Sequence, residues 1–240
     1  MRVLITGSEG FIGKNLVSHL SELKEIKVIR FSKKHTIKDL AEFIKNVDFV
    51  FHLAGVNRTD NKKDFKQVNH DLTESLCDLM FLSNRKIPLI FSSSTQVIQD
   101  NDYGRTKLSA EKIVNNYAKN SGANTFIYRF PNLFGKWCKP NYNSVVSTFC
   151  NNIANNLPIQ INNPNHEMKL MYVDDVMSEF LSVLFQREDK PSIDNIPVYE
   201  ISLGKLAEKI QEFHNNRSSL TIDRVGSGFI RALYSTYLSY

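Results

Sequence analysis

A serine, a tyrosine and a lysine lie close together in the stretch SSSTQVIQDNDYGRTK, residues 92–107. A spacing of four residues puts Tyr103 and Lys107 on one face of a helix. We expect the Lys107 ammonium to lower the pKa of the phenol, whose ordinary value of about 10 suits proton transfer near neutrality poorly. Ser94 can hydrogen-bond the same substrate oxygen. Together they could protonate a ketone as a hydride arrives from a cofactor, or run the reverse.

A glycine-rich segment, TGSEGFIG at residues 6–13, directly follows the apolar run VLIT and opens a helical pattern. Its three glycines would permit, in chain order, a tight turn, close approach of a pyrophosphate and packing of the helix on the strand: Gly7, Gly10 and Gly13. The free amide groups around Phe11 and Ile12 would then face phosphate groups, helped by the helix dipole. This context predicts a dinucleotide site.

The end of the second apolar run, VIRFSKK, indicates which dinucleotide binds. An NAD site favours an acidic residue there, to accept hydrogen bonds from the ribose hydroxyls, and none is present. The polar residues are instead Arg30, Ser32, Lys33 and Lys34, which match the charge of a 2′-phosphate. NADPH is therefore the predicted cofactor, and a basic loop in a basic protein is the alternative.

Two further runs end where open α/β sheets bind ligands. FHLAG, residues 51–55, would let the cofactor pass over Leu53, Ala54 and Gly55, while His52 inside the run is expected to be a core histidine. PLIFSSS places Ser94 at the same edge.

Apolar runs that alternate with amphipathic stretches predict the fold class: an α/β protein with a doubly wound, Rossmann-type parallel sheet and a small C-terminal substrate-binding region. The expected strands, buried on both faces, are 3–6, 27–31, 48–54, 88–93 and 125–130. The expected helices between them are 11–23, 36–46, 65–84 and 103–120.

The second half is less regular. It is expected to add helices at 143–156, 174–187 and 203–216 and strands at 168–173 and 198–202, with Ser202 as an N-cap. We expect a single domain, in which 1–135 and 168–186 mainly bind the dinucleotide and 136–167 and 187–240 mainly bind substrate or partners. The aromatic segment 229–240 is expected to dock on another domain or subunit.

Composition narrows the function classes. The chain has 240 residues and a net charge of +5, and its basic residues are scattered, which favours an anionic small molecule over nucleic acid. Three cysteines without CxxC spacing, Cys77, Cys138 and Cys150, indicate reduced thiols in a cytoplasmic protein, with no metal site. The N-terminal apolar run is too short for a signal peptide, and no stretch is long enough to insert into a membrane.

The motifs TGSEGFIG, DFVFHLAG, SSS, YGRTK, YRFPNLFG and YVDDV resemble, in content and order, the extended short-chain dehydrogenases/reductases (the NAD-dependent epimerase/dehydratase family) that act on nucleotide sugars. The resemblance implies catalytic roles for Ser94, Tyr103 and Lys107. It also implies that Pro131 lies beside the nicotinamide and that Asn132 lies near the nucleotide diphosphate.

The segments AGVNR, DNDYG, LYSTYLSY and the stretch from YRFPNLFG to STFC resemble more closely the reductase domain of two-domain capsular-polysaccharide enzymes that make a precursor of UDP-N-acetyl-L-fucosamine. The resemblance implies reduction, with NADPH, of the C4 ketone of a UDP-4-keto-2-acetamido-2,6-dideoxy sugar to a UDP-2-acetamido-2,6-dideoxy-L-talose. It further implies a C-terminal zinc-binding cupin domain beyond this chain and a homodimer.

The chain departs from the wider family in three ways. The loop between Ser94 and Tyr103 is short, the region between strands two and four is trimmed, and the arginine that usually precedes YVDD is missing. Three basic residues are candidates to replace its charge on the UDP: Arg58, Lys139 and Lys169.

Two alternatives remain open. A 4-epimerase or dehydratase would retain NAD, but Thr95 and Gln96 stand where a dehydratase needs an acid–base pair, and the basic cluster at 30–34 disfavours NAD. A non-catalytic dinucleotide-binding scaffold would not need Ser94, Tyr103 and Lys107 together.

Overall fold

The computed structural model describes residues 1–187, 190–220 and 225–240. The chain forms two compact units. The first comprises Met1–Phe130 and Met177–Asn195, and the second comprises Pro131–Val176 and Ile196–Tyr240. No helix within the described ranges has the length and apolar character needed to cross a membrane.

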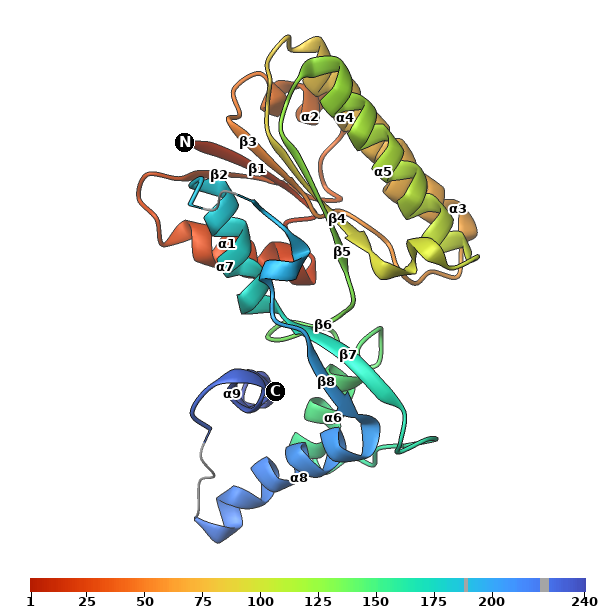
Figure 1. Cartoon of the computed structure of the whole chain (residues 1–240), viewed down its shortest axis with the longest axis vertical. Coiled ribbons are helices and arrows are strands. Elements are labelled where there is room, and N and C mark those ends of the chain that lie inside the picture. The colour runs from red at the N-terminus through yellow and green to blue at the C-terminus, as the bar shows by residue number, and fades with distance from the viewer. Residues whose placement is uncertain (188–189, 221–224) are drawn as a thin grey trace. The chain divides into compact units, whose positions relative to one another are not determined.

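The first unit is built on five parallel strands in the order β2-β1-β3-β4-β5 (Figure 1). These are β1 (Arg2–Thr6), β2 (Lys27–Phe31), β3 (Phe49–His52), β4 (Leu89–Ser94) and β5 (Thr125–Phe130). The chain goes from β1 to β2 on one side and then returns to place β3 on the other side of β1. This reversal creates a switch point between β1 and β3, where such sheets bind ligands at the carboxyl ends of their strands. The expected Rossmann-type sheet is confirmed.

Helices cover both faces of this sheet (Figure 1). On one face lie α2 (Ile37–Ile44), α4 (Leu72–Leu82) and α5 (Asp102–Ser121), which close an apolar core with the sheet. On the other lie α1 (Phe11–Ser21) and the part of α7 (Val173–Leu184) that starts at Met177.

Burial follows the position of each strand in the sheet. Every residue of β3 and β4 is buried, because these inner strands have neighbours on both sides and helices above and below. The edge strands β2 and β5 expose Arg30 and Arg129. The expectation that all five strands are buried on both faces is therefore wrong for the two edge strands.

The expected helix 65–84 is divided in the structure. It starts as α3 (Lys62–Asp64), continues as a π-helical segment (Phe65–Asp71) and becomes α4 at Leu72. Inside the π-helical segment, the buried Asn69 side chain accepts a hydrogen bond from the Val56 N–H at 2.8 Å and donates one to the Val56 carbonyl at 2.9 Å. This pair of bonds ties the segment to the chain that follows β3.

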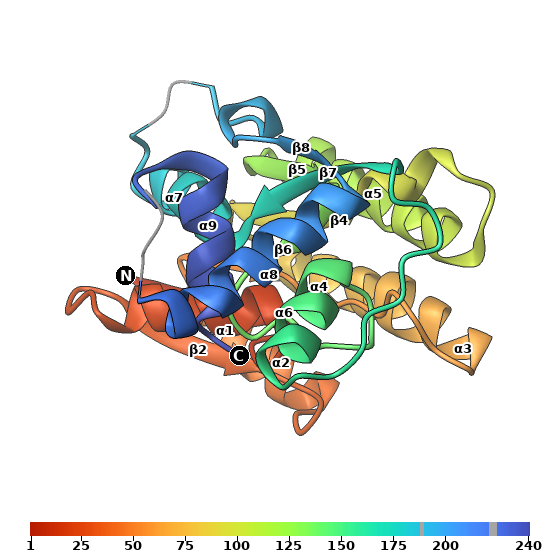
Figure 2. The ribbon, with the colours of Figure 1, turned by 90° about the horizontal axis from the view of Figure 1, so that it is seen from below.

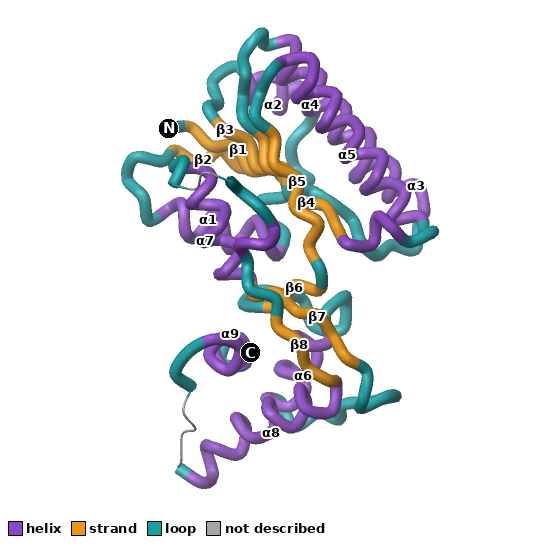
Figure 3. Tube along the Cα trace, in the orientation of Figure 1, coloured by secondary structure: helices purple, strands orange, loops and turns teal. Residues whose placement is uncertain are grey.

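The second unit contains a three-stranded sheet in the order β6-β7-β8 (Figure 3). In this sheet β7 is parallel to β6 and antiparallel to β8. Its strands are β6 (Asn132–Phe134), β7 (Glu167–Tyr172) and β8 (Tyr199–Ser202). Its helices α6 (Val145–Ala154), α8 (Leu203–Ser219) and α9 (Gly228–Tyr237) pack together (Figure 2). Ser202 does precede α8, but its side chain makes no capping hydrogen bond.

The aromatic C-terminal segment packs inside the second unit. Leu233 and Tyr237 on α9 are buried, and Tyr237 lies against Phe213 of α8 with ring centroids 6.1 Å apart. The Tyr240 hydroxyl donates to the carbonyl of Cys138 and shares a hydrogen bond of 2.5 Å with Ser147. These contacts bury Leu233 and Tyr237 within their own unit, so these two side chains do not belong to a docking surface. Docking by the rest of 229–240, where Leu238 is exposed, stays a prediction.

Candidate active site

The switch point of the first unit leaves little space above the sheet edge. Gly7 directly follows β1 and has a φ of +68°, a conformation that favours glycine. A Cβ at this position would lie 2.6 Å from the backbone nitrogen of Ala54, which follows β3. The Ala54 N–H in turn donates to the Thr6 hydroxyl at 3.2 Å. The turn after β1 and the segment 53–55 are thus in direct contact.

The start of α1 has the properties of a phosphate site. Gly10 is its N-cap and offers no side-chain acceptor, and the first turn carries no acidic residue. The backbone N–H groups that follow, including those of Phe11 and Ile12, therefore remain available to an anion at the positive end of the helix dipole. A Cβ on Gly13 would lie 2.9 Å from the Cα of Ser8, so this position also requires glycine. The glycine turn fits the diphosphate of a dinucleotide.

The end of β2 lies directly beside this turn. Both the N–H and the hydroxyl of Ser8 donate to the carbonyl of Phe31, each at 3.3 Å. Around this point Arg30 and Lys33 are exposed, while Ser32 is buried and its N–H donates to His35 Nδ1 at 3.1 Å.

Lys34, the fourth polar residue of this cluster, is partly used by a contact within the protein. Its ammonium pairs with Glu9 of the glycine turn at 3.6 Å. The structure brings the predicted basic cluster next to the phosphate site, with two cations that face solvent.

A buried hydrogen-bonded chain supports the sheet edge. The Thr73 hydroxyl donates to the Asn69 carbonyl, so His52 Nε2 donates to Thr73 at 2.8 Å, and His52 Nδ1 accepts from Thr6 at 2.6 Å. Burial lowers the pKa of His52 to about 3, so the ring is neutral at physiological pH. His52 is the core histidine that the sequence predicts, and it fixes the position of Thr6, to which Ala54 is bonded.

The reacting end of the site is formed by β4 and α5. The Tyr103 side chain hydrogen-bonds Ser94. Burial raises the pKa of Tyr103, and the bond to Ser94 opposes that shift to a smaller degree. The expectation that an ammonium lowers this pKa is wrong in the structure, because loss of hydration is the dominant effect.

Lys107 is buried with 3% of its surface exposed, and its ammonium donates to the carbonyl of Ser92 at 2.7 Å. The ammonium also lies 4.7 Å from the centre of the Phe91 ring. Burial lowers the pKa of Lys107 to about 8, and the charge of Glu111 opposes this shift. Lys107 is therefore poised to change charge close to physiological pH.

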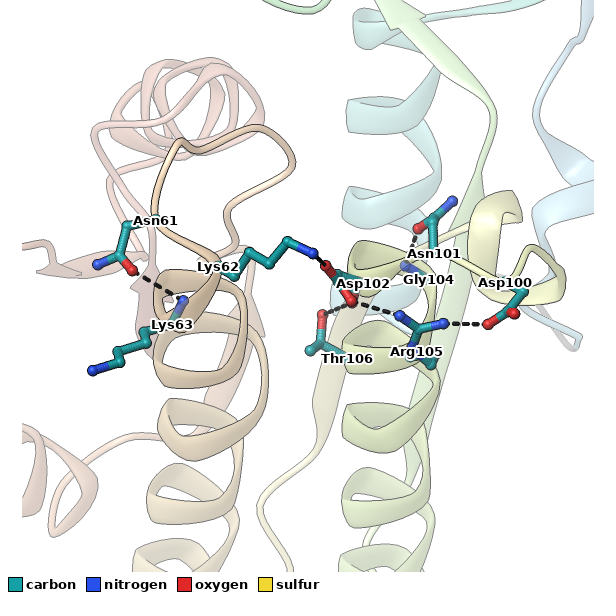
Figure 4. Close-up of polar contacts among 9 residues, drawn as sticks. All are labelled: Asn61, Lys62, Lys63, Asp100, Asn101, Asp102, Gly104, Arg105 and Thr106. Atoms are coloured by element: carbon teal, nitrogen blue, oxygen red, sulfur yellow. Dashed lines mark hydrogen bonds and ion pairs between the residues drawn. The ribbon is translucent and has the colours of Figure 1, made fainter.

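The first turn of α5 is held from several sides (Figure 4). The Asn101 side chain accepts from the Gly104 N–H at 2.7 Å, and Gly104 lies so near the backbone of Gln96 and Gln99 that a Cβ would meet Gln99 O at 2.9 Å. Asp102 pairs with Lys62 of α3 at 3.1 Å.

Arg105 adds a second cation to this network. It contacts both Asp102, at 2.5 Å, and Asp100 (Figure 4). These contacts flank Tyr103 on both sides along the chain.

The segment that follows β3 also lies close to Lys107. A Cβ on Gly55 would lie 3.2 Å from the Lys107 ammonium and 3.3 Å from the Asn69 side-chain oxygen. The first unit therefore brings together the glycine turn, the basic end of β2, the segment 53–55 and the Ser94–Tyr103–Lys107 group along one edge of its sheet.

The remaining expected residues are distributed differently. Arg58 is exposed in the first unit, whereas Pro131, Asn132, Lys139 and Lys169 belong to the second. Pro131 and Asn132 follow β5 directly along the chain. Their roles, and those of the lysines, stay predictions.

The two lysines of the second unit differ in their surroundings. Lys139 has its ammonium 5.5 Å from the centre of the Tyr142 ring, and Lys169 pairs with Glu200 at 3.3 Å. Lys169 therefore has an acidic partner that a phosphate would have to replace.

Two residues of the site, Glu111 and Asn69, were not predicted from the sequence. Glu111 follows Lys107 by four residues, so helical spacing could have indicated it. Asn69 gave no such signal, because the backbone that it bonds, at Val56, is remote in sequence.

The fold and the site define a Rossmann-type dinucleotide-binding protein with a serine, tyrosine and lysine at the carboxyl edge of the sheet. Residues 3–198 match the model of the NAD dependent epimerase/dehydratase family, and the chain belongs to this family. Membership implies a nicotinamide dinucleotide as cofactor.

Comparison with known proteins gives three informative relatives. The chain is 48% identical over 241 residues to UDP-2-acetamido-2,6-beta-L-arabino-hexul-4-ose reductase from Pseudomonas aeruginosa. This alignment covers 100% of the present chain and 65% of the relative. It is 38% identical to the crystal structure of capsular polysaccharide assembling protein CapF from Staphylococcus aureus, with a TM-score of 0.89, and covers 65% of that chain. UDP-glucuronic acid 4-epimerase from Bacillus cereus shares the fold at 16% identity, with a TM-score of 0.80, over 100% of this chain and 98% of that one. The chain thus spans about two thirds of the length of the first two relatives.

Proposed function

We propose that this chain is an NADPH-dependent reductase of the C4 ketone of a UDP-4-keto-2-acetamido-2,6-dideoxyhexose. Its product would be a UDP-2-acetamido-2,6-dideoxy-L-talose, for the synthesis of a capsule or another surface polysaccharide. The observation that carries the proposal is the Ser94–Tyr103–Lys107 group beside a glycine turn that fits a dinucleotide. The activity for which the Pseudomonas aeruginosa relative is named favours this substrate class.

The bound dinucleotide would supply the hydride that reduces the ketone carbon. The chain's own residues would handle the ketone oxygen. The Ser94 hydroxyl would orient that oxygen, and the Tyr103 hydroxyl would deliver the proton. The raised pKa keeps the phenol protonated at neutral pH but makes it a weaker acid, so proton transfer would depend on stabilisation of the phenolate that forms. The Lys107 ammonium would then stabilise the phenolate that remains until solvent returns a proton.

The cofactor side of the proposal rests on charge. The glycine turn and the start of α1 would hold the diphosphate, and Leu53, Ala54 and Gly55 would face the dinucleotide as it crosses the sheet edge. The exposed Arg30 and Lys33 would pair with a 2′-phosphate.

Further cofactor contacts would complete this side. Ser32 would add a hydroxyl beside the 2′-phosphate, and Pro131 would lie beside the nicotinamide. An enzyme of the same family that prefers NADH would not need two exposed cations at the end of β2.

On the substrate side, we propose that Asn132 contacts the nucleotide diphosphate. Arg58, Lys139 and Lys169 are the basic residues proposed to offset its charge. A homodimer, a following cupin domain and a cytoplasmic location remain predictions for the full-length protein.

A 4-epimerase or dehydratase with retained NAD is the second enzymatic candidate. The Bacillus cereus epimerase shows that the fold itself admits such chemistry. Thr95 and Gln96, which follow Ser94 in this chain, supply no carboxylic acid for elimination. A scaffold without catalysis would have no use for a buried lysine beside a tyrosine.

The decisive test is the absorbance of NADPH on addition of a UDP-4-keto-2-acetamido-2,6-dideoxy sugar. Oxidation of one NADPH per sugar reduced supports the proposal. Conversion of the sugar without net oxidation would identify an epimerase or dehydratase, and unchanged sugar and cofactor would favour the scaffold.

A further inference from the structure

The three serines at the end of β4 each meet a different turn of α5. The Ser94 side chain hydrogen-bonds Tyr103, the Ser92 carbonyl accepts from Lys107 at 2.7 Å, and Ser93 donates to Glu111 at 2.5 Å. The three helical partners are spaced by four residues, so they form one row on the face of α5 that lies against the strand. Two members of the row belong to the proposed catalytic group, and Glu111 is the third.

Glu111 is a buried carboxylate with a complete set of partners. Only 4% of its surface is exposed. Besides Ser93, it receives two parallel hydrogen bonds from Arg129 of β5, Nε to Oε1 at 2.9 Å and Nη2 to Oε2 at 2.7 Å. Ser93 and Arg129 are paired residues of the two neighbouring strands. Glu111 therefore joins α5 to both β4 and β5 at one level of the sheet.

The same carboxylate acts on the buried lysine. The groups that act on or contact Lys107 are Glu111 on its own helix, His52 on β3 and uncharged groups of β4. His52 is neutral at physiological pH because burial lowers its pKa to about 3. Glu111 is thus the negative charge that offsets the desolvation of the Lys107 ammonium.

Arg129 limits this effect without abolishing it. The Arg129 side chain is 48% exposed, so solvent screens its positive charge, whereas the Glu111 side chain is only 5% exposed. An ion pair that served only to join strand and helix would not need to lie one helical turn from a lysine of the active site.

We propose that Glu111 is a positioning residue of the active site, which keeps Lys107 in the ammonium form and holds it in register with the end of β4. The part of this inference that concerns turnover rests on the proposed reductase function, while the part that concerns the charge of Lys107 does not. Glu111 touches neither substrate nor cofactor in this account and acts through Lys107.

The experiment measures the titration of Lys107 directly. Protein labelled with ¹³C at the lysine ε-carbons is titrated by NMR, and the Lys107 signal is assigned by its loss in K107R. We expect Glu111→Gln to lower the pKa of Lys107 by about one unit, because an uncharged amide no longer stabilises the ammonium. In the aspartate variant E111D, which keeps the negative charge, the pKa of Lys107 should stay close to its value in the unaltered protein.

Glu179 provides the matched control. It is buried to the same extent, with 5% exposure, and it accepts from the Tyr128 hydroxyl at 2.6 Å in the same compact unit. Glu179→Gln removes a buried carboxylate of equal kind but should leave the Lys107 titration where it is. A similar shift in both variants would mean that general loosening of the unit, and not Glu111, moves the lysine.

Arg129→Gln gives a test of opposite sign that also serves if E111Q does not fold. Removal of the half-exposed guanidinium leaves the Glu111 charge less neutralised, so the pKa of Lys107 should rise. An unchanged Lys107 titration in E111Q, or in R129Q where E111Q cannot be purified, would overturn the inference.

Activity adds a second readout. With a UDP-4-keto sugar, the alkaline limb of the pH profile of kcat/KM, which reports groups of the enzyme before substrate binds, should move to lower pH in E111Q, in the same direction as the Lys107 titration. If no reductase activity exists, the profile is lost for every variant while the NMR shift remains, so failure of the function and failure of this inference are distinguishable.

Discussion

The two ends of the proposed cofactor site use positive charge in opposite ways. At the end of β2, Arg30 and Lys33 are exposed and surrounded by water. At the end of β4, Lys107 has 3% of its surface exposed and is bonded to a backbone carbonyl at 2.7 Å. The first pair can attract a phosphate but has little influence on proton chemistry, because water screens it. The second is dehydrated, and burial brings its pKa to about 8, within reach of physiological pH.

Under the proposed function, this difference would separate cofactor recognition from catalysis within one sheet edge. Exposed cations bind an anion with an energy that salt weakens, so their substitution should change affinity and selectivity. A buried group whose charge depends on its neighbours should instead change the rate and its pH dependence. Substitutions at the two ends can therefore test whether the end of β2 determines cofactor affinity while the end of β4 determines the reaction rate.

The largest effect is expected at the reacting end. Tyr103→Phe removes the proton donor and keeps the ring, so turnover of a UDP-4-keto sugar should fall by roughly 100-fold or more. NADPH binding, measured by fluorescence titration, should change little because the hydroxyl contributes mainly to the reaction. Near-native turnover in this variant would exclude Tyr103 as the donor.

The next effect is expected at the end of β2. Arg30→Ala should weaken NADPH binding by roughly 10-fold or more, since a charge-assisted hydrogen bond contributes about 1.5–3 kcal/mol. NADH, which lacks the 2′-phosphate, should lose far less. Dissociation constants for both cofactors, measured at two salt concentrations, check this, and equal losses would contradict the assignment of Arg30 to the 2′-phosphate.

The smallest effect is expected in the second unit. Lys139→Ala should weaken UDP binding by about three- to tenfold, as expected for one partly screened charge. Trp137 is the one tryptophan of the chain and lies two residues away, so its fluorescence reports on this loop. Lys169→Ala is the comparison, and it should cost less because Lys169 already pairs with Glu200. A larger loss for Lys169→Ala would reverse the proposed roles.

Much of the first unit could be predicted from the sequence. The five strands and the helices between them follow from local apolar periodicity, and the expected strand 27–31 coincides with β2. The glycine turn needed only the order strand, glycines, helix. The spacing of Tyr103 and Lys107 needed only the geometry of a helix. The π-helical segment around Asn69 and the short strand β6 had no comparable signal, because they depend on contacts with remote parts of the chain.

The sequence by itself determined the fold class, the edge of the sheet that carries the site and the residue types gathered there, since all of these follow from patterns within a few residues. Only the tertiary structure decided that burial raises the pKa of Tyr103, that Glu111 opposes the desolvation of Lys107 and that Leu233 and Tyr237 near the C-terminus are buried within their own unit. Dehydration and long-range charge depend on which distant segments meet, and local sequence does not encode that information in a readable form.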